Sequence, residues 1–201
     1  CEQALSAFRT IGMQVDGARL SEDAGAMWRT AVALRHWSAG ADLQGYYDDP
    51  AKRKLLKPEA IWEVEGGMAL TGPQLAKASE GRTRIFEAFR KAFGTFDFLA
   101  LPAAQVFPFD KTLRWPETAG GHAMDTYHRR MQITIPATMS GLPAPAASTA
   151  VGAAGRPTGL QTVAPNPREL ACPPHAAAYD AESDWLPPPP PPLPVRQRRQ
   201  P

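Results

Sequence analysis

The sequence has few of the residues from which disulfide frameworks and metal clusters are built. Its 201 residues include only two cysteines, Cys1 and Cys172. Two such residues are too few for a disulfide-stapled scaffold or a cysteine metal cluster. We therefore expect a reducing, cytoplasmic compartment. A separate expectation is that the protein uses neither a metal nor an organic cofactor.

Long apolar runs and a strong charge of one sign are also missing. No stretch approaches the roughly 18 apolar residues of a membrane-spanning helix, and no signal-peptide pattern is present. The formal net charge is only +2, and the basic excess comes from Arg196, Arg198 and Arg199 near the C-terminus. The sequence therefore predicts neither a membrane partner nor a nucleic-acid partner.

The common local signatures of catalysis are absent as well. The sequence contains no G-x-S-x-G, no phosphate-binding G-x4-G-K-[S/T], no H-E-x-x-H, no C-x-x-C and no S-x-x-K. We interpret His122 and His128 as surface histidines, with a metal or general-base role as the alternative. His36 is interpreted as a cation that favours the C-terminal end of a helix dipole, and Cys172 as a small core residue. Taken alone, the residues predict no self-contained active site.

Apolar periodicity and capping residues predict an α/β body. Pro58 and Pro73 suit first helical positions, Ser21 suits a helix cap, and Gly66-Gly67 suits a helix end. The apolar run before Pro102 suits a buried strand. The expected helices cover 2–11, 21–37, 58–67, 73–93, 123–132 and a segment from 166 onward, and the expected strands cover 13–15, 97–101 and 159–163.

A shift in composition near residue 186 divides the chain into a folded body, 1–186, and a proline-rich basic tail, 187–201. The tail should adopt polyproline II and then disorder. Pro191, Pro194 and Arg196 fit the P-x-x-P-x-R pattern that SH3 domains bind. We favour a passive tail over an SH3 ligand, because this pattern arises easily in proline-rich sequence.

The second half of the body resembles the C-terminal part of the amidase signature family. The blocks occur in the family's order and spacing, and the likeness extends back through 56–67 to cover about residues 1–185. The blocks are FDFLALPAAQVFPFD (96–110), WPETAGGHAMDTYHRRM (115–131), SGLPAPA (140–146), GRPTGLQTVAP (155–165) and RELAC (168–172).

The resemblance implies part of an α/β fold in which helices cover a mixed central sheet, incomplete in this chain. Family members hydrolyse amides with a nucleophilic Ser, a second Ser in a cis peptide and a Lys base. They carry these groups on a Gly/Ser-rich segment that this sequence lacks, so we assign no catalytic residue here. The chain, which opens on Cys1 rather than Met, is expected to be a C-terminal amidase fragment that is inactive alone.

The expected partner is a small-molecule amide bound by the full-length parent. The resemblance leaves open which amide this is and whether the protein forms a homodimer. Trp115, Tyr127 and Met131 are candidates for the substrate pocket, with the 123–132 helix near its entrance. The alternative for the aromatic residues, Trp62 included, is a role in the core.

The sequence departs from the family pattern at two places in the body. Pro145 should remove a hydrogen-bond donor from an interior strand, and Pro173 and Pro174 should weaken the last helix. Sequence error, a frameshift or a decayed gene would explain the departures at 144–151, 173–175 and 187–201. The rival interpretation is a non-catalytic remnant that presents its proline-rich tail to an SH3-type partner.

Overall fold

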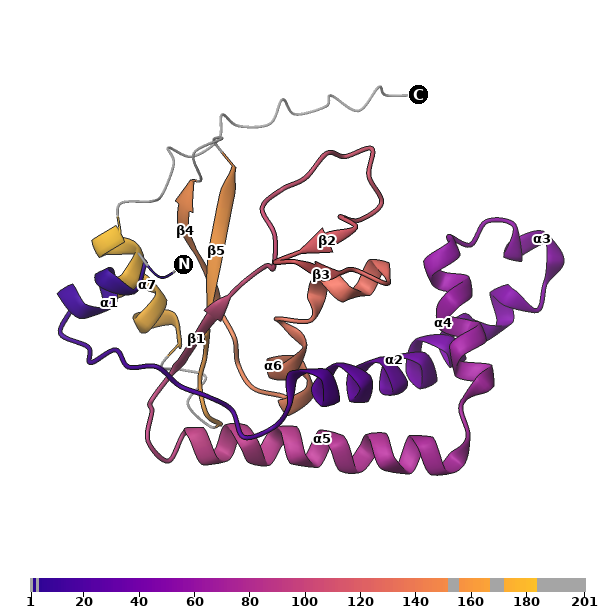
Figure 1. Cartoon of the computed structure of the whole chain (residues 1–201), viewed down its shortest axis with the longest axis horizontal. Coiled ribbons are helices and arrows are strands. Elements are labelled where there is room, and N and C mark those ends of the chain that lie inside the picture. The colour runs from indigo at the N-terminus through magenta and orange to yellow at the C-terminus, as the bar shows by residue number, and fades with distance from the viewer. Residues whose placement is uncertain (1, 3, 152–155, 167–171, 184–201) are drawn as a thin grey trace, which may run out of the picture.

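A computed structural model describes residues 2, 4–151, 156–166 and 172–183 of the chain. The predictions for Pro167, for residues 168–171 and for the 187–201 tail lie outside these residues, and the boundary at 186 stays a prediction. Figure 1 shows the arrangement. The elements are α1 (Leu5–Thr10), α2 (Ala24–Tyr47), α3 (Pro50–Arg53), α4 (Pro58–Ala69), α5 (Gly72–Ala92), β1 (Leu99–Pro102), β2 (Thr118–Ala119), β3 (His122–Ala123), the 3-10 helix η1 (Tyr127–Met131), α6 (Ile135–Ser140), β4 (Ala146–Val151), β5 (Pro157–Val163) and α7 (Cys172–Ser183).

The centre of the fold is a three-stranded sheet in the order β1-β5-β4. Both pairings are antiparallel, and Leu99 of β1 lies opposite Val163 of β5. The expected strands at 97–101 and 159–163 are thus confirmed, and they are direct neighbours although far apart in sequence. The α/β fold class is confirmed with them.

The side chains of β5 belong to two separate hydrophobic cores, because successive side chains of a strand point to opposite faces. Val163 packs on one face against Ile85 and Phe89 of α5. Leu160 packs on the other face against Phe8 of α1 and Tyr179 of α7. Figure 1 shows α1 and α7 on one side of the sheet and α2, α5 and α6 on the other.

Helix α5 follows the sequence prediction closely. Thr71 and Gln74 form a capping box, with the Thr71 side chain accepting from the Gln74 amide while the Gln74 side chain accepts from the Thr71 amide. Buried Ile85 and Phe89 lie on its inner face. This helix is long, amphipathic and locally capped, which is why its limits could be predicted.

The limits of helices α2 and α4 differ from the predicted ones. Helix α2 begins after the cap Asp23 rather than Ser21, and it continues to Tyr47 rather than Trp37. Gly66-Gly67 lies inside α4 instead of ending it. A Cβ on Gly67 would come within 2.5 Å of the His36 carbonyl oxygen of α2. These glycines therefore serve close helix packing, which local sequence does not reveal.

Between β3 and β4 the chain forms two short helices rather than the predicted 123–132 helix. The first is η1, and the second is α6, which the sequence analysis missed. Gly141 ends α6 at φ +65°, a conformation in which Gly carries no Cβ penalty. The Gly-Leu-Pro block is thus a helix stop that returns the chain to the sheet.

The prolines that depart from the family pattern stand at the beginnings of their elements. Pro145 lies immediately before β4, and its carbonyl accepts from the Thr162 amide at 3.0 Å. Helix α7 begins at Cys172, so Pro173 and Pro174 occupy its first turn, where amide protons have no partner within a helix. Pro145 therefore does not lie inside the strand, where it was expected, whereas the weakening of the last helix stays a prediction.

None of the described helices has the length and apolar content needed to cross a bilayer.

Candidate functional site

A cleft of about 590 Å³ lies beside the sheet, between the loop that follows β1 and the helix η1. We call it the η1 cleft. Its floor is formed by the facing ends of β4 and β5, and its walls are mostly apolar. The lining residues are Ala103, Ala104, Gln105, Val106, Phe107, Pro108, Phe109, Arg130, Met131, Thr134, Ala146, Ala147, Ser148, Pro157, Thr158 and Gly159.

Backbone and amide hydrogen bonds hold the loop of this cleft against η1 and the sheet. The Ala103 amide donates to the Gly159 carbonyl at 2.9 Å. With its side-chain nitrogen facing η1, Gln105 donates to the carbonyls of Arg129 and Arg130 at 2.6 and 2.9 Å. The cleft is therefore largely formed before any ligand enters.

The Gly-Leu-Gln block on β5 has a second role in this arrangement. The buried Gln161 amide donates to the Pro102 carbonyl at 3.0 Å and to the Ile133 carbonyl at 3.2 Å. One side chain thus joins the end of β1 to the turn between η1 and α6. In the sequence this glutamine is only part of a family block, and its structural role could not be predicted.

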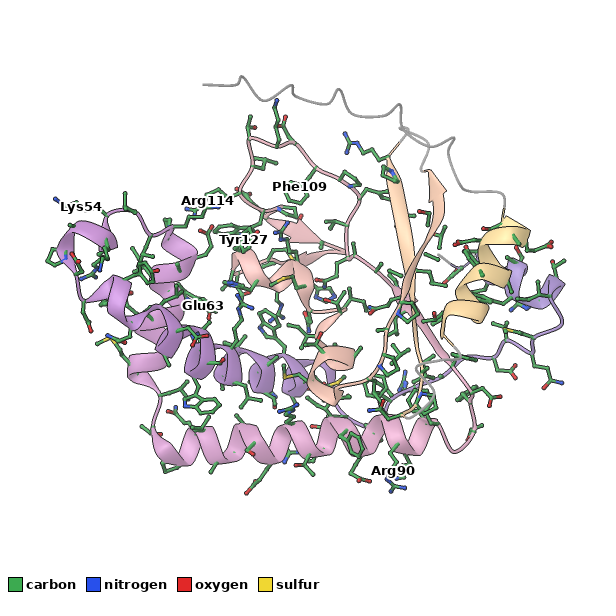
Figure 2. All side chains as sticks on the ribbon, turned by 180° about the vertical axis from the view of Figure 1, so that it is seen from behind. Lys54, Glu63, Arg90, Phe109, Arg114 and Tyr127 are labelled. Atoms are coloured by element: carbon green, nitrogen blue, oxygen red, sulfur yellow. The ribbon has the colours of Figure 1, made fainter. Side chains whose placement is uncertain are left out.

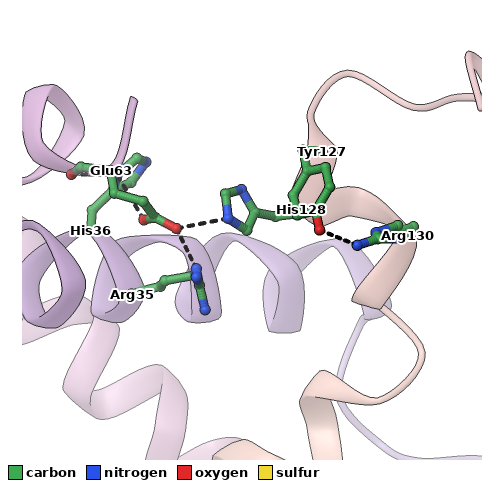
Figure 3. Close-up of polar contacts among 6 residues, drawn as sticks. All are labelled: Arg35, His36, Glu63, Tyr127, His128 and Arg130. Atoms are coloured by element: carbon green, nitrogen blue, oxygen red, sulfur yellow. Dashed lines mark hydrogen bonds and ion pairs between the residues drawn. The ribbon is translucent and has the colours of Figure 1, made fainter. Parts of the chain in front are cut away.

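Beneath η1 lies a group of polar residues that we call the Glu63 cluster: the buried residues Glu63, His36 and His128, and Arg35, whose side chain is 47% exposed. Glu63 of α4 is only 2% exposed. Its Oε1 accepts from Arg35 Nε and from His128 Nε2, the latter at 2.9 Å. His36 Nδ1 lies 3.2 Å from the Glu63 carbonyl oxygen. Figure 3 shows the cluster linking α2, α4 and η1.

These contacts overturn the surface interpretation of His128, and the structure places His36 in the interior of α2 rather than near a helix end. His36 and His128 are 9% and 4% exposed, and the Trp62 ring lies 4.1 Å from the first and 5.1 Å from the second, centroid to centroid. His122, in contrast, is exposed as expected. Sequence reasoning missed the cluster because its members lie on three elements that no local motif connects.

The electrostatics of the cluster favour a neutral His128. Burial lowers the pKa of His128, while the Glu63 carboxylate acts in the opposite direction and Arg35 adds to the lowering. A neutral imidazole that donates from Nε2 leaves Nδ1 as a buried acceptor, and Nδ1 has no partner among the described residues. The cluster therefore holds η1 in place while the Glu63 carboxylate is paired with the Arg35 guanidinium. The described residues include no group of His, Cys, Asp or Glu suited to a metal.

A second opening, the α4 cleft of about 770 Å³, lies beside the Glu63 cluster. Arg114 and Tyr127 lie at its edge above Glu63, as Figure 2 shows. Arg114 pairs with Glu59, and this pair lowers the pKa of Glu59 against the effect of burial, together with a backbone hydrogen bond. Of the charged side chains that line this cleft, Arg35 pairs with Glu63 and Arg114 pairs with Glu59, while Lys57 forms no ion pair within the described part of the chain.

The three predicted pocket residues are not gathered in one place. Tyr127 lines the α4 cleft and Met131 lines the η1 cleft, from opposite ends of η1. Trp115 lines neither of these two clefts, and its Nε1 donates to the Met124 carbonyl at 3.0 Å. The residue that sequence reasoning overlooked is Arg130, which lies between Tyr127 and Met131 and lines the η1 cleft.

Comparison with known proteins defines the class. The profile of the Amidase family matches residues 2–172. The chain is 28% identical over 158 residues to a glutamyl-tRNA(Gln) amidotransferase subunit from Synechococcus sp. (strain RCC307), covering 78% of this chain and 30% of that protein. It is 27% identical over 167 residues to the corresponding subunit from Archaeoglobus fulgidus, covering 80% of this chain and 33% of that protein.

Solved structures agree on the fold. A bacterial aryl acylamidase of the amidase signature family superposes with a TM-score of 0.82 at 17% identity, over 92% of this chain and 39% of that one. A 6-aminohexanoate cyclic dimer hydrolase superposes with a TM-score of 0.67 at 19% identity, over 92% of this chain and 40% of that one. The chain belongs to the amidase signature family. It spans about a third of the length of the curated relatives it matches.

Proposed function

We propose that this chain is the C-terminal part of a hydrolase that cleaves the C–N bond of a small carboxamide. The proposal rests on the difference between the share of this chain that the family profile matches and the share of its relatives' length that this chain covers. The Amidase profile extends over residues 2–172, yet the chain accounts for only 30–33% of two full-length relatives. It also lacks the Gly/Ser-rich run on which the resemblance places the reacting groups.

In this proposal the two parts of the enzyme divide the work. The part outside this sequence supplies a nucleophilic Ser, a bridging Ser in a cis peptide and a Lys base. Lys accepts the nucleophile's proton through the bridging Ser, and backbone amides stabilise the tetrahedral oxyanion. An acyl-enzyme forms as the amine or ammonia leaves, and water then releases the acid.

The contribution of this chain is to bind and orient the substrate. The β1-β5-β4 sheet supplies the frame, and the η1 cleft is a preformed, mostly apolar opening at its end. Met131 lies in that cleft, while Tyr127 and Trp115 stay candidates for the wider pocket. Holding the amide near the nucleophile converts an encounter into an intramolecular step. A cytoplasmic location and a homodimer also stay predictions.

The test is to restore the missing part. The DNA upstream of Cys1 is read in frame for a Lys and a Gly/Ser-rich run, and the joined chain is expressed beside the 201-residue chain. Release of aniline from acylanilides and of ammonia from primary amides is measured for both. We expect hydrolysis by the joined chain, none by the 201-residue chain, and loss of activity when the nucleophilic Ser becomes Ala.

Amide hydrolysis by the purified 201-residue chain would contradict the division of work. A folded joined chain without activity on any amide would contradict the proposed reaction itself. The Ser→Ala variant is the matched control, because it removes the nucleophile and leaves the cleft intact.

A further inference from the structure

The charge in the η1 cleft is concentrated in one side chain. Among the described residues that line it, Arg130 alone carries a charge, and none is an Asp or Glu. The others are apolar, such as Phe107, Phe109 and Met131, or neutral polar, such as Thr134. A ligand in this cleft therefore meets an apolar wall and one cation.

The guanidinium of Arg130 is held but incompletely paired. It lies over the Tyr127 ring, 4.2 Å from the centroid, and one terminal nitrogen donates to the Tyr127 hydroxyl oxygen. Its Nε is buried and has no acceptor in the described part of the chain. A buried donor on a charged group is costly to leave unpaired, so the guanidinium keeps hydrogen-bonding capacity that Tyr127 does not use.

The position of Arg130 is fixed from beneath and from the side. His128, two residues earlier on η1, donates to buried Glu63. Gln105 binds the Arg130 carbonyl from the loop across the cleft. Figure 3 shows Arg130 and Tyr127 on the same short helix that His128 ties to Glu63. Because η1 is held at both points, the guanidinium is oriented before a ligand arrives.

We propose that the η1 cleft binds ligands in which an apolar body carries a carboxylate, and that this carboxylate pairs with Arg130. The planar guanidinium matches the two oxygens of a carboxylate. The volume of about 590 Å³ lies within the usual range for small-molecule sites. The inference rests on the proposed function and sharpens it: the substrate is an amide that also carries a carboxylate.

The first test measures binding without catalysis. The whole 201-residue chain is titrated in a calorimeter with 4-phenylbutyrate and with its neutral analogue 4-phenylbutanamide. We expect the carboxylate to bind about tenfold more tightly, as one charge-assisted pair provides. Arg130→Met should abolish this preference. Arg129→Met is the matched control, because Arg129 stacks on Trp28 and does not line the cleft.

Equal affinity for the two ligands, no binding of either one, or a preference that survives Arg130→Met would overturn the inference. A preference lost equally in Arg129→Met would also overturn it, because general surface charge would then be the cause.

The second test uses the joined chain with N-phenylsuccinamic acid and its methyl ester. Arg130→Met should raise KM for the acid about tenfold and leave KM for the ester unchanged. An unchanged ratio of the two KM values contradicts the carboxylate assignment even if both amides are hydrolysed. Carboxylate binding by the 201-residue chain together with an inactive joined chain would instead contradict only the amidase proposal.

Discussion

His128 of η1 donates from Nε2 to Oε1 of Glu63 on α4, across 2.9 Å and with both side chains almost fully buried. This contact joins the wall of the η1 cleft to the helical layer on which it rests. Arg35 of α2 shares the same carboxylate oxygen. The buried Glu63 carboxylate therefore connects α2, α4 and η1.

Glu63→Ala should destabilise the fold because it leaves Arg35 and His128 without their acceptor. The buried His128 donor loses its acceptor, whereas half-exposed Arg35 can turn to solvent, so we expect a loss of about 2 kcal/mol of unfolding free energy. The measurement is urea unfolding followed by circular dichroism. Glu65→Ala on the same helix is the control, since Glu65 is half exposed and pairs with Arg53 at the surface. A loss as small as that of the control, within about 0.5 kcal/mol, would mean that the cluster contributes little.

Acidification should weaken the fold through His128. Burial lowers the pKa of this imidazole in the folded protein, opposed by Glu63 and assisted by Arg35, with Glu59 and His36 as further charged or titratable neighbours. The unfolded chain then binds more protons once the pH falls below about 6.5, so the contribution is complete above that pH and declines toward the folded-state pKa.

The check is the urea midpoint at a pH of about 7.5 and at about 5.5, a window above the titration of ordinary carboxylates. His128→Gln should flatten the difference between the two midpoints, whereas exposed His122→Gln should leave it unchanged. An equal slope in the wild type and in His128→Gln would assign the acid sensitivity to another group.

Gly67→Ala should destabilise α4, although Ala is the better helix former. The new Cβ would lie 2.5 Å from the His36 carbonyl oxygen, a backbone atom that cannot rotate away. We expect a loss of about 2 kcal/mol, typical of overpacking at a tight helix contact. Gly45→Ala in α2 is the control: its Cβ meets nothing within 4 Å, so it should gain about 0.5–1 kcal/mol. Thermal melts of the two variants should therefore shift in opposite directions.

Gln161→Leu should weaken the contact between the sheet and the segment that contains η1. It leaves the carbonyls of Pro102 and Ile133 without the donor that now binds both, at a cost of about 2 kcal/mol. Amide hydrogen exchange over 127–135 should rise more than exchange over α5. Gln132→Leu is the control, because Gln132 makes one exposed contact, to the Ala24 carbonyl at 3.3 Å. Unchanged protection of 127–135 in Gln161→Leu would contradict this role.

Elements with strong local signals could be predicted from the sequence. Pro73 marks the start of α5, and the apolar run before Pro102 indicates β1. The ends of α2 and α4 could not be predicted, because Gly66-Gly67 carries the local signature of a helix stop and is kept helical by contact with α2. The family blocks predicted the fold class correctly, since they depend on order and spacing along the chain.

The candidate site was predicted only in part. Tyr127 and Met131 were chosen because the resemblance places the 123–132 helix near the substrate entrance, and the structure places them in different clefts on either side of Arg130. Arg130 gave no signal in the sequence, because one arginine beside another is usually a solvated residue. Arg130 matters because the residues that line the η1 cleft with it carry no charge. Most of those residues come from the loop after β1 and from β4 and β5, which are distant from Arg130 in the sequence.

The sequence by itself determined that this chain is an α/β member of the amidase signature family and that these 201 residues contain no Gly/Ser-rich run. Composition, block order and a missing motif are properties of the chain, and no folding is needed to observe them. Only the tertiary structure decided that two histidines meet a buried glutamate and that one arginine faces an apolar cleft. The reason is physical: burial and charge pairing arise between segments distant in sequence, and they exist only once α4, η1 and the sheet have packed together.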